Sequence, residues 1–191
     1  MTSNRPAIER FLGDIASEHV APAGGTATAV VGAVGASLCE MVCIHTAESD
    51  AATELADVRA DLSTERGHLL DLAEADATLV DDLFGGAAGA PDDADIERAV
   101  GVPLAIAESC LTVLELAGDV TATGAPTALA DAATGVTLTH AALQAALFTA
   151  RRNLDRLDDT SFVDETERRL AELEVRADDT RDRAMRHVEA E

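Results

Sequence analysis

An aspartate interrupts a hydrophobic seam in this sequence. Leu55, Leu62, Leu69 and Leu83 recur in a seven-residue register typical of the buried face of an amphipathic helix, and Asp76 occupies the position between the last two. A carboxyl group withdrawn from water holds its proton more readily, so Asp76 is a candidate general acid or base near neutral pH. The alternative is that the helices diverge at this turn and leave Asp76 in solvent. The sequence favours neither.

A second candidate site is the run Gly24-Gly25-Thr26, which stands where a loop enters a predicted helix. Free backbone N–H groups and the helix dipole at such a start favour an anion, for example the carboxylate tail of a ligand. The alternative is an ordinary helix start with a threonine cap, which is more common. The run is therefore a candidate binding loop, but a sequence signal of this kind is weak evidence on its own.

Metal and nucleotide sites lack support in this sequence. The histidines show no mutual ligand spacing, and Cys39, Cys43 and His45 would not project from one helical face, so we expect no metal. The sequence contains no G-x-S-x-G motif, no P-loop and no G-x-G-x-x-G after a strand. The commonest hydrolase and nucleotide-binding classes are therefore not indicated.

The charge of the chain is extreme. Its formal net charge is -22, from 36 acidic residues against 14 basic ones, and every basic residue is arginine. Such a surface repels itself unless salt screens it, which favours a halophilic protein from a salt-rich cytoplasm. The alternative is an ordinary acidic protein. Nucleic acid is disfavoured as a partner in either case.

Cysteine use and the N-terminal sequence also indicate a cytoplasmic protein. The three cysteines lie on apolar helical stretches, where buried free thiols are expected rather than disulfides. No basic segment precedes an apolar one at the N-terminus, so we expect no signal peptide. The uncharged run from Val20 to Cys39 contains Pro22 and a Gly-Gly pair and meets Glu40, so we expect no membrane span.

The composition predicts an all-α fold for one domain over residues 1–191. Aromatic residues make up only 2% of the chain, and Ala, Leu, Asp, Glu and Arg dominate, a composition typical of helices. Apolar periodicity and Gly/Pro breaks predict an antiparallel bundle of five or six helices. The expected helices cover residues 6–17, 26–47, 50–83, 93–117, 127–157 and 164–188.

The second of these helices carries a smooth stripe of small residues, Ala29, Gly32, Ala33 and Ala36. Left to solvent, such an uncharged stripe would be unusual. We therefore predict a homodimer built partly on this face.

Several motifs, taken in order, carry a resemblance to a known family. Phe11–Ser17, then Pro22–Thr26, then the small-residue helix through Val42 match an opening of the form F-x-x-x-(L/V)-A, P-x-P-G-G-G-(S/T) and an Ala/Gly helix. Further on, Leu72–Ala77 matches L-x-x-x-D-A, and Ala99–Glu108 matches A-x-x-V-P-L-x-(L/I)-A-E. The sequence resembles the folate cyclodeaminase/cyclohydrolase family.

The remaining matches lie nearer the C-terminus. Gly118-Asp119 stands where the family has G-N, and Asp131 falls at the aspartate of its S-D pair, 22 positions before Asn153. The sequence departs from the pattern at Ala23, Asp119, Ala130 and Thr149. These departures leave room for a paralogue with altered or lost activity.

The resemblance implies an all-helical homodimer that acts on tetrahydrofolate derivatives without a further cofactor. Asp76 and Asp131 would be the catalytic acids. The substrate would be bound by five residues: Gly24, Gly25, Thr26, Asp119 and Asn153. The favoured reaction is hydrolysis of 5,10-methenyltetrahydrofolate to 10-formyltetrahydrofolate. The first alternative is cyclodeamination of formiminotetrahydrofolate, and the second is a non-catalytic helical scaffold.

Overall fold

The computed structural model describes residues 4–46, 51–85 and 91–189, with side chains of the third helix described from Leu55 onward. These residues form helices and no strand, which confirms the predicted all-α class. The helices are α1 (Arg5–Ile15), α2 (Gly24–His45), α3 (Ala51–Phe84), α4 (Asp93–Thr123), α5 (Leu129–Leu154) and α6 (Thr160–Glu189), with a short 3₁₀ turn at Pro126–Ala128.

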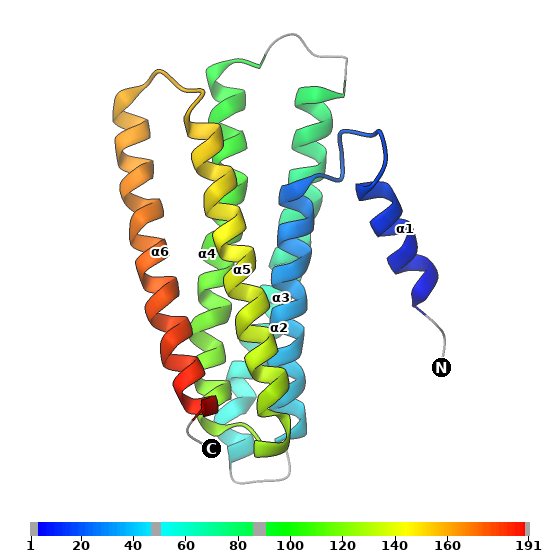
Figure 1. The fold of residues 1–191 in the computed structure, drawn as a ribbon, viewed down its shortest axis with the longest axis vertical. Helices are drawn as coiled ribbons and strands as arrows, with labels where there is room; N and C mark the ends of the chain where they lie inside the picture. The colour runs from blue at the N-terminus through cyan, green and yellow to red at the C-terminus, as the bar shows by residue number, and fades with distance from the viewer. Residues whose placement is uncertain (1–3, 47–50, 86–90, 190–191) are drawn as a thin grey trace.

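Helices α2 to α6 run alternately up and down as an antiparallel bundle, and α1 lies apart from it (Figure 1). Helix α2 packs against α3 and α5, while α4 packs against α3, α5 and α6. None of the residues of α1 is buried, and Ile8 and Leu12 are exposed. Because the helices alternate in direction, four helix ends meet at one end of the bundle. These are the start of α2, the end of α3, the start of α4 and the end of α5.

The predicted leucine seam forms part of the core. Leu55, Leu62, Leu69 and Leu83 are all buried, and the side chains around them are mostly Ala, Val and Leu. The chain thus buries its apolar surface through close packing of helices with small side chains rather than through large aromatic groups. At the crossing of α2 and α5, a Cβ on Gly135 would lie only 2.9 Å from the carbonyl oxygen of Gly35.

The small-residue stripe does not lie at a subunit contact, and that prediction is wrong. Ala29, Gly32, Ala33 and Ala36 are buried inside the bundle of a single chain. A Cβ on Gly32 would come within 2.8 Å of the sulfur of Cys110 on α4. The small side chains of the stripe let α2 approach other helices of its own chain closely. The same close approach was expected for a helix of a partner subunit.

Several predicted helix boundaries need correction. Helix α5 ends at Leu154 rather than at residue 157, and α6 begins at Thr160 rather than at residue 164. Helix α2 begins at Gly24 rather than Thr26, so both glycines belong to its first turn. Helix α4 continues through Gly118 to Thr123, because Ala117, Val120 and Thr121 are buried and hold this stretch on the bundle. Asp119 therefore lies on a helix surface and not in a loop. The predicted boundaries at Ala47 and Asp50, and most of the connection between the expected helices 50–83 and 93–117, lie outside the described residues.

Helices α2 and α4 are long and apolar enough to cross a membrane, judged by length and composition alone. In the structure, 44% of the apolar window of α2 and 56% of that of α4 are buried inside the bundle. Core helices of water-soluble bundles meet the same criterion.

The cysteines are free and buried, as predicted. Burial raises the pKa of Cys39 and Cys110 to about 12 and that of Cys43 to about 11. Because thiolates are the reactive form, we expect the native protein to resist an aromatic disulfide reagent at pH 8, whereas denaturant should release all three thiols. Absorbance of the released aromatic thiol measures both. Rapid labelling of the native state would contradict the packing of these helices.

Stability should depend on salt. Ion pairs such as Arg176–Glu115 and Arg151–Glu174 link helices, but exposed pairs contribute at most about 1 kcal/mol each, and 14 arginines cannot offset 36 acids. The Debye length falls from about 10 Å at 0.1 M salt to about 3 Å at 1 M, which screens the repulsion. We expect Tm to rise by several degrees over this range, since each kcal/mol is worth roughly 2–4 °C at this chain length. A Tm indifferent to salt would remove the halophilic interpretation.

Candidate active site

Asp76 is buried at the contact between α3 and the first turn of α2. Its side chain is only 6% exposed, and the hydroxyl of Thr26 donates a 2.7 Å hydrogen bond to its Oδ2 atom. Gly25 lies directly against the carboxylate, because a Cβ at that position would be 2.1 Å from Asp76 Oδ1. The solvent-exposed alternative for Asp76 is therefore wrong. A carboxyl group lies in the core with one hydroxyl donor and one glycine to accommodate it.

Asp76 opens onto a cavity of about 180 Å³ at this end of the bundle. Four helices and the turn after α5 contribute to it, and Gly24, Gly25 and Asn153 are among its lining residues. Thr26 does not line the cavity, but its hydroxyl donates the hydrogen bond to Asp76. The lining residues are Ala23, Gly24, Gly25, Asp76, Leu79, Val80, Leu83, Phe84, Ala99, Thr149, Asn153 and Arg156.

The side-chain amide of Asn153 is held by a carbonyl group that a proline leaves free. In an α-helix the carbonyl of Ala99 would accept the N–H of residue 103, but Pro103 has no N–H. Asn153 Nδ2 donates to this carbonyl oxygen at 2.6 Å instead. The amide nitrogen is thereby engaged, and its Oδ1 remains the acceptor that Asn153 can offer to a ligand.

The first turn of α2 supplies donors to the same cavity. The first N–H groups of a helix have no acceptor within the helix, and in α2 Gly24 and Gly25 carry such groups and line the cavity. Ala23 precedes them without a side-chain cap. The cavity thus combines backbone donors, one carboxylate and one amide oxygen, a set that could bind a polar heterocycle and move a proton on it.

Asp119 and Asp131 lie at the opposite end of the bundle from this cavity. Asp131 is in the first turn of α5 and Asn153 in the last, 22 residues away, which corresponds to about 33 Å along a helix. Asp119 follows Ala99 by 20 residues on α4, or about 30 Å. Both acids are exposed. Within one subunit the structure does not bring either of them to Asp76, and their predicted roles have no support from this cavity.

Arg156, Phe84 and Thr149 line the cavity but were not predicted to contribute to a site. Thr149 and Asn153 lie one turn apart on α5, and Arg156 follows three residues later in the turn after that helix. That spacing was the available signal. In the sequence, residues about one turn before and after Asn153 share its surroundings, so Thr149 and Arg156 are candidates wherever Asn153 is one.

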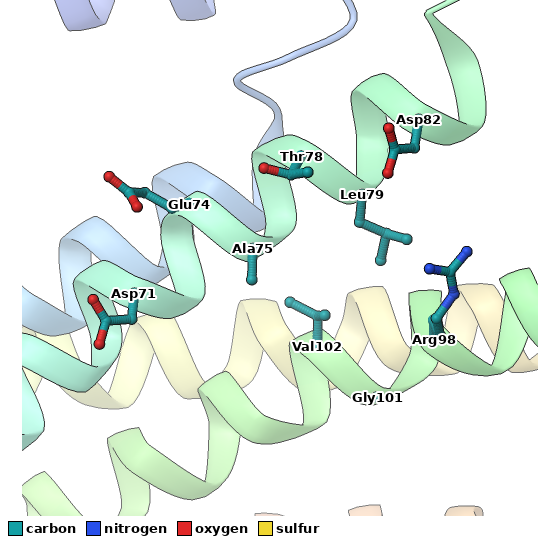
Figure 2. A pocket seen from close by; sticks show the side chains of 9 residues that line it. All are labelled: Asp71, Glu74, Ala75, Thr78, Leu79, Asp82, Arg98, Gly101 and Val102. Carbon is teal, nitrogen blue, oxygen red and sulfur yellow. The ribbon is translucent and has the colours of Figure 1, made fainter. Parts of the chain in front are cut away.

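A wider groove of about 650 Å³ lies on the other side of Leu79, between α3 and α4. Figure 2 shows Ala75 and Leu79 facing Val102, with Asp71 and Glu74 turned toward the edge of the groove. Arg98 at its far end is engaged by Asp95 at 2.5 Å. Asp76 does not line this groove, so we assign the candidate site to the smaller cavity.

Among the residues that the structure describes, no group of three His, Cys, Asp or Glu side chains could hold a metal ion.

Taken together, these features define an all-helical protein with one buried acid in a cavity between helix ends. The chain belongs to the formiminotransferase-cyclodeaminase family, whose sequence model matches residues 7–172. A methenyltetrahydrofolate cyclohydrolase from Methylorubrum extorquens is 34% identical over 183 residues, covering 87% of this chain and 86% of that protein. The family resemblance is thereby confirmed.

The fold is also found in a solved structure. Formiminotetrahydrofolate cyclodeaminase from Thermotoga maritima superposes with a TM-score of 0.88 over 96% of both chains, at 21% sequence identity. This similarity confirms the fold and leaves the choice of reaction to the site.

Proposed function

We propose that this protein is an enzyme of one-carbon metabolism that hydrolyses 5,10-methenyltetrahydrofolate to 10-formyltetrahydrofolate. The observation that carries the proposal is Asp76, a buried carboxyl group that faces a cavity and is held by Thr26 and Gly25. The relative from Methylorubrum extorquens, named for this reaction, supports the choice.

In the proposed mechanism, a water molecule adds to the carbon of the methenyl bridge, which carries the positive charge of an amidinium. Asp76 accepts the proton that the water loses as its oxygen bonds to this carbon. The bond from the carbon to N5 then breaks as Asp76 returns the proton to N5. The remaining hydroxyl proton of the adduct passes to solvent, and the carbon stays on N10 as a formyl group. The negative charge of Asp76 also suits a cationic substrate.

The substrate would be oriented by the other polar groups of the cavity. The N–H groups of Gly24 and Gly25 would face the carbonyl oxygen of its pterin ring, and Asn153 Oδ1 would accept from a ring N–H group. No further cofactor is needed, since the reaction is an addition of water. Asp119 and Asp131 would act on a substrate only if a second subunit brought them to the cavity.

Two other functions stay open. Cyclodeamination of formiminotetrahydrofolate, with release of ammonia, would use the same acid to protonate the leaving nitrogen, and the Thermotoga maritima structure with that name shares the fold. A non-catalytic scaffold is the second. The departures at Ala23 and Thr149 are relevant to both, because these residues line the cavity.

We further propose a cytoplasmic homodimer in which residues 1–191 form a single domain. With the small-residue stripe buried, the subunit contact would use the outer face of α2, where Val31, Val34 and Ile44 are exposed. Light scattering in molar salt tests this, and a monomer at micromolar concentration would contradict it.

One assay separates the candidate reactions. In buffer with molar salt, loss of the methenyl absorbance should accelerate with enzyme concentration, while formiminotetrahydrofolate should release no ammonia beyond the uncatalysed rate. Release of ammonia instead would assign the protein to cyclodeamination. Binding of a folate without either reaction would favour the scaffold.

A further inference from the structure

We propose that Arg156 binds the glutamate carboxylate of the substrate at the mouth of the cavity and so fixes which end of the substrate enters. This inference rests on the proposed function and names the residue that recognises the tail of the folate.

The charges of the cavity lie at different depths. Among the described lining residues, Asp76 and Arg156 carry the charges. Asp76 is only 6% exposed, whereas Arg156 is exposed, so we place the carboxylate at the inner end and the guanidinium at the opening. A ligand with a cation at one end and an anion at the other would match this arrangement, and the methenyl substrate has that form.

The size of the cavity requires the tail to remain outside. Pockets that enclose whole drug-sized ligands measure about 300–1,000 Å³, and this cavity measures about 180 Å³. A cavity of this size leaves no room for the aminobenzoyl-glutamate portion beside the reacting rings. That portion must pass the opening, where Arg156 lies.

Arg156 is also held ready for an anion. Its guanidinium lies over the ring of Phe84, 5.8 Å from the centroid, and its backbone N–H donates to the carbonyl of Asn153. The nearby Arg151 and Arg152 are paired with Glu174 and Asp155, but within the described residues no carboxylate pairs with Arg156. A stacked guanidinium keeps its N–H fork free for a carboxylate.

The overall charge makes such a residue necessary. A protein with a net charge of -22 repels a substrate that carries two carboxylates, and the repulsion acts before the cationic ring reaches Asp76. A local cation at the opening offsets it where the tail must lie. Arg156 therefore orients the substrate with its bridge carbon inward.

The test compares Arg156→Gln with Arg152→Gln, which removes an exposed arginine of the same segment that does not line the cavity. Arg156→Gln should raise KM for methenyltetrahydrofolate roughly 10- to 100-fold and leave kcat within about twofold, because a tail contact is equally present in ground and transition states. Arg152→Gln should change neither. Equal KM values for the parent and Arg156→Gln would overturn the inference and leave the proposed reaction standing.

A modified substrate tests which group Arg156 contacts. Converting the two glutamate carboxyl groups of the substrate to amides should raise KM for the parent about as much as Arg156→Gln does, and should have little further effect on the variant. Full additivity of the two changes would overturn the carboxylate assignment.

Binding separates this inference from the reaction itself. If the parent shows no turnover, calorimetric titration with 5-formyltetrahydrofolate, which has the same tail, still measures the contact. Parent binding that weakens roughly tenfold or more in Arg156→Gln, but not in Arg152→Gln, supports the inference even though the proposed reaction fails. No binding by the parent overturns both.

Discussion

Asp76→Asn is expected to lower kcat by about 10²- to 10⁴-fold while the protein stays folded. Asparagine matches the shape of aspartate and can still accept the hydrogen bond from Thr26, which is 2.7 Å long in the parent. It cannot take up or return the proton of the attacking water. The loss should therefore fall on kcat, measured as the rate of loss of methenyl absorbance at saturating substrate.

Asp82→Asn is the matched control, because Asp82 is an exposed acid on the same helix that borders the wider groove and not the cavity. It should retain parental kcat and Tm. If Asp76→Asn hydrolyses the substrate as fast as the parent, Asp76 is a structural residue and the proposed mechanism is wrong. If the variant unfolds, its circular dichroism spectrum will show this before any rate is interpreted.

The helix face that carries Asp76 could be predicted because it depends on local periodicity, whereas the burial of Asp76 could not. A seven-residue repeat of leucine specifies a helix face without reference to any other part of the chain, and Leu55, Leu62, Leu69 and Leu83 are buried as expected. The groups that contact Asp76 depend instead on which helix ends meet. Gly25 and Thr26 lie about 50 residues earlier in the chain, and only the family motif connected them to the acid.

The case of Asp131 shows a constraint that the sequence already contained. Asp131 and Asn153 were both assigned to one predicted helix, over residues 127–157, and 22 residues of helix span about 33 Å. No cavity of this size in one subunit includes both. The family resemblance pointed to Asp131 and Asn153 as site residues. The length of the helix that carries both is enough to exclude them from one site within a single subunit.

The small-residue stripe illustrates what periodicity cannot decide. Ala29, Gly32, Ala33 and Ala36 predict close approach of another backbone, and the structure confirms that approach. Whether the neighbour belongs to the same chain or to another is a tertiary question, because burial has the same signature in both cases. The partner helices are α3, α4 and α5 of the same subunit.

Gly25→Ala is expected to have the second large effect, because it adds a methyl group where the carboxylate of Asp76 lies. The new Cβ would be 2.1 Å from Oδ1, 2.6 Å from Cγ and 2.9 Å from Oδ2 of Asp76, so rotation of the carboxylate does not relieve the clash. Either the start of α2 or Asp76 must move. We expect a loss of about 1–3 kcal/mol in stability and, since a displacement of about 1 Å is costly to catalysis, a roughly 10²-fold loss in kcat.

Gly24→Ala is the control for this change, since a Cβ at Gly24 meets no atom within 4 Å. Its stability should be unchanged or higher by about 0.4–1 kcal/mol, its kcat should be unchanged, and any effect of the added methyl on substrate binding should fall on KM. The clash itself is tested in an Asp76→Ala background, where the carboxylate is absent. There, Gly25→Ala should cost little stability, because the two residues interact directly and their effects are not additive. Thermal melts in molar salt of the parent, Gly25→Ala, Asp76→Ala and the double variant measure this coupling. An equal destabilisation by Gly25→Ala in both backgrounds would show that the glycine is required for the backbone of α2 and not for Asp76.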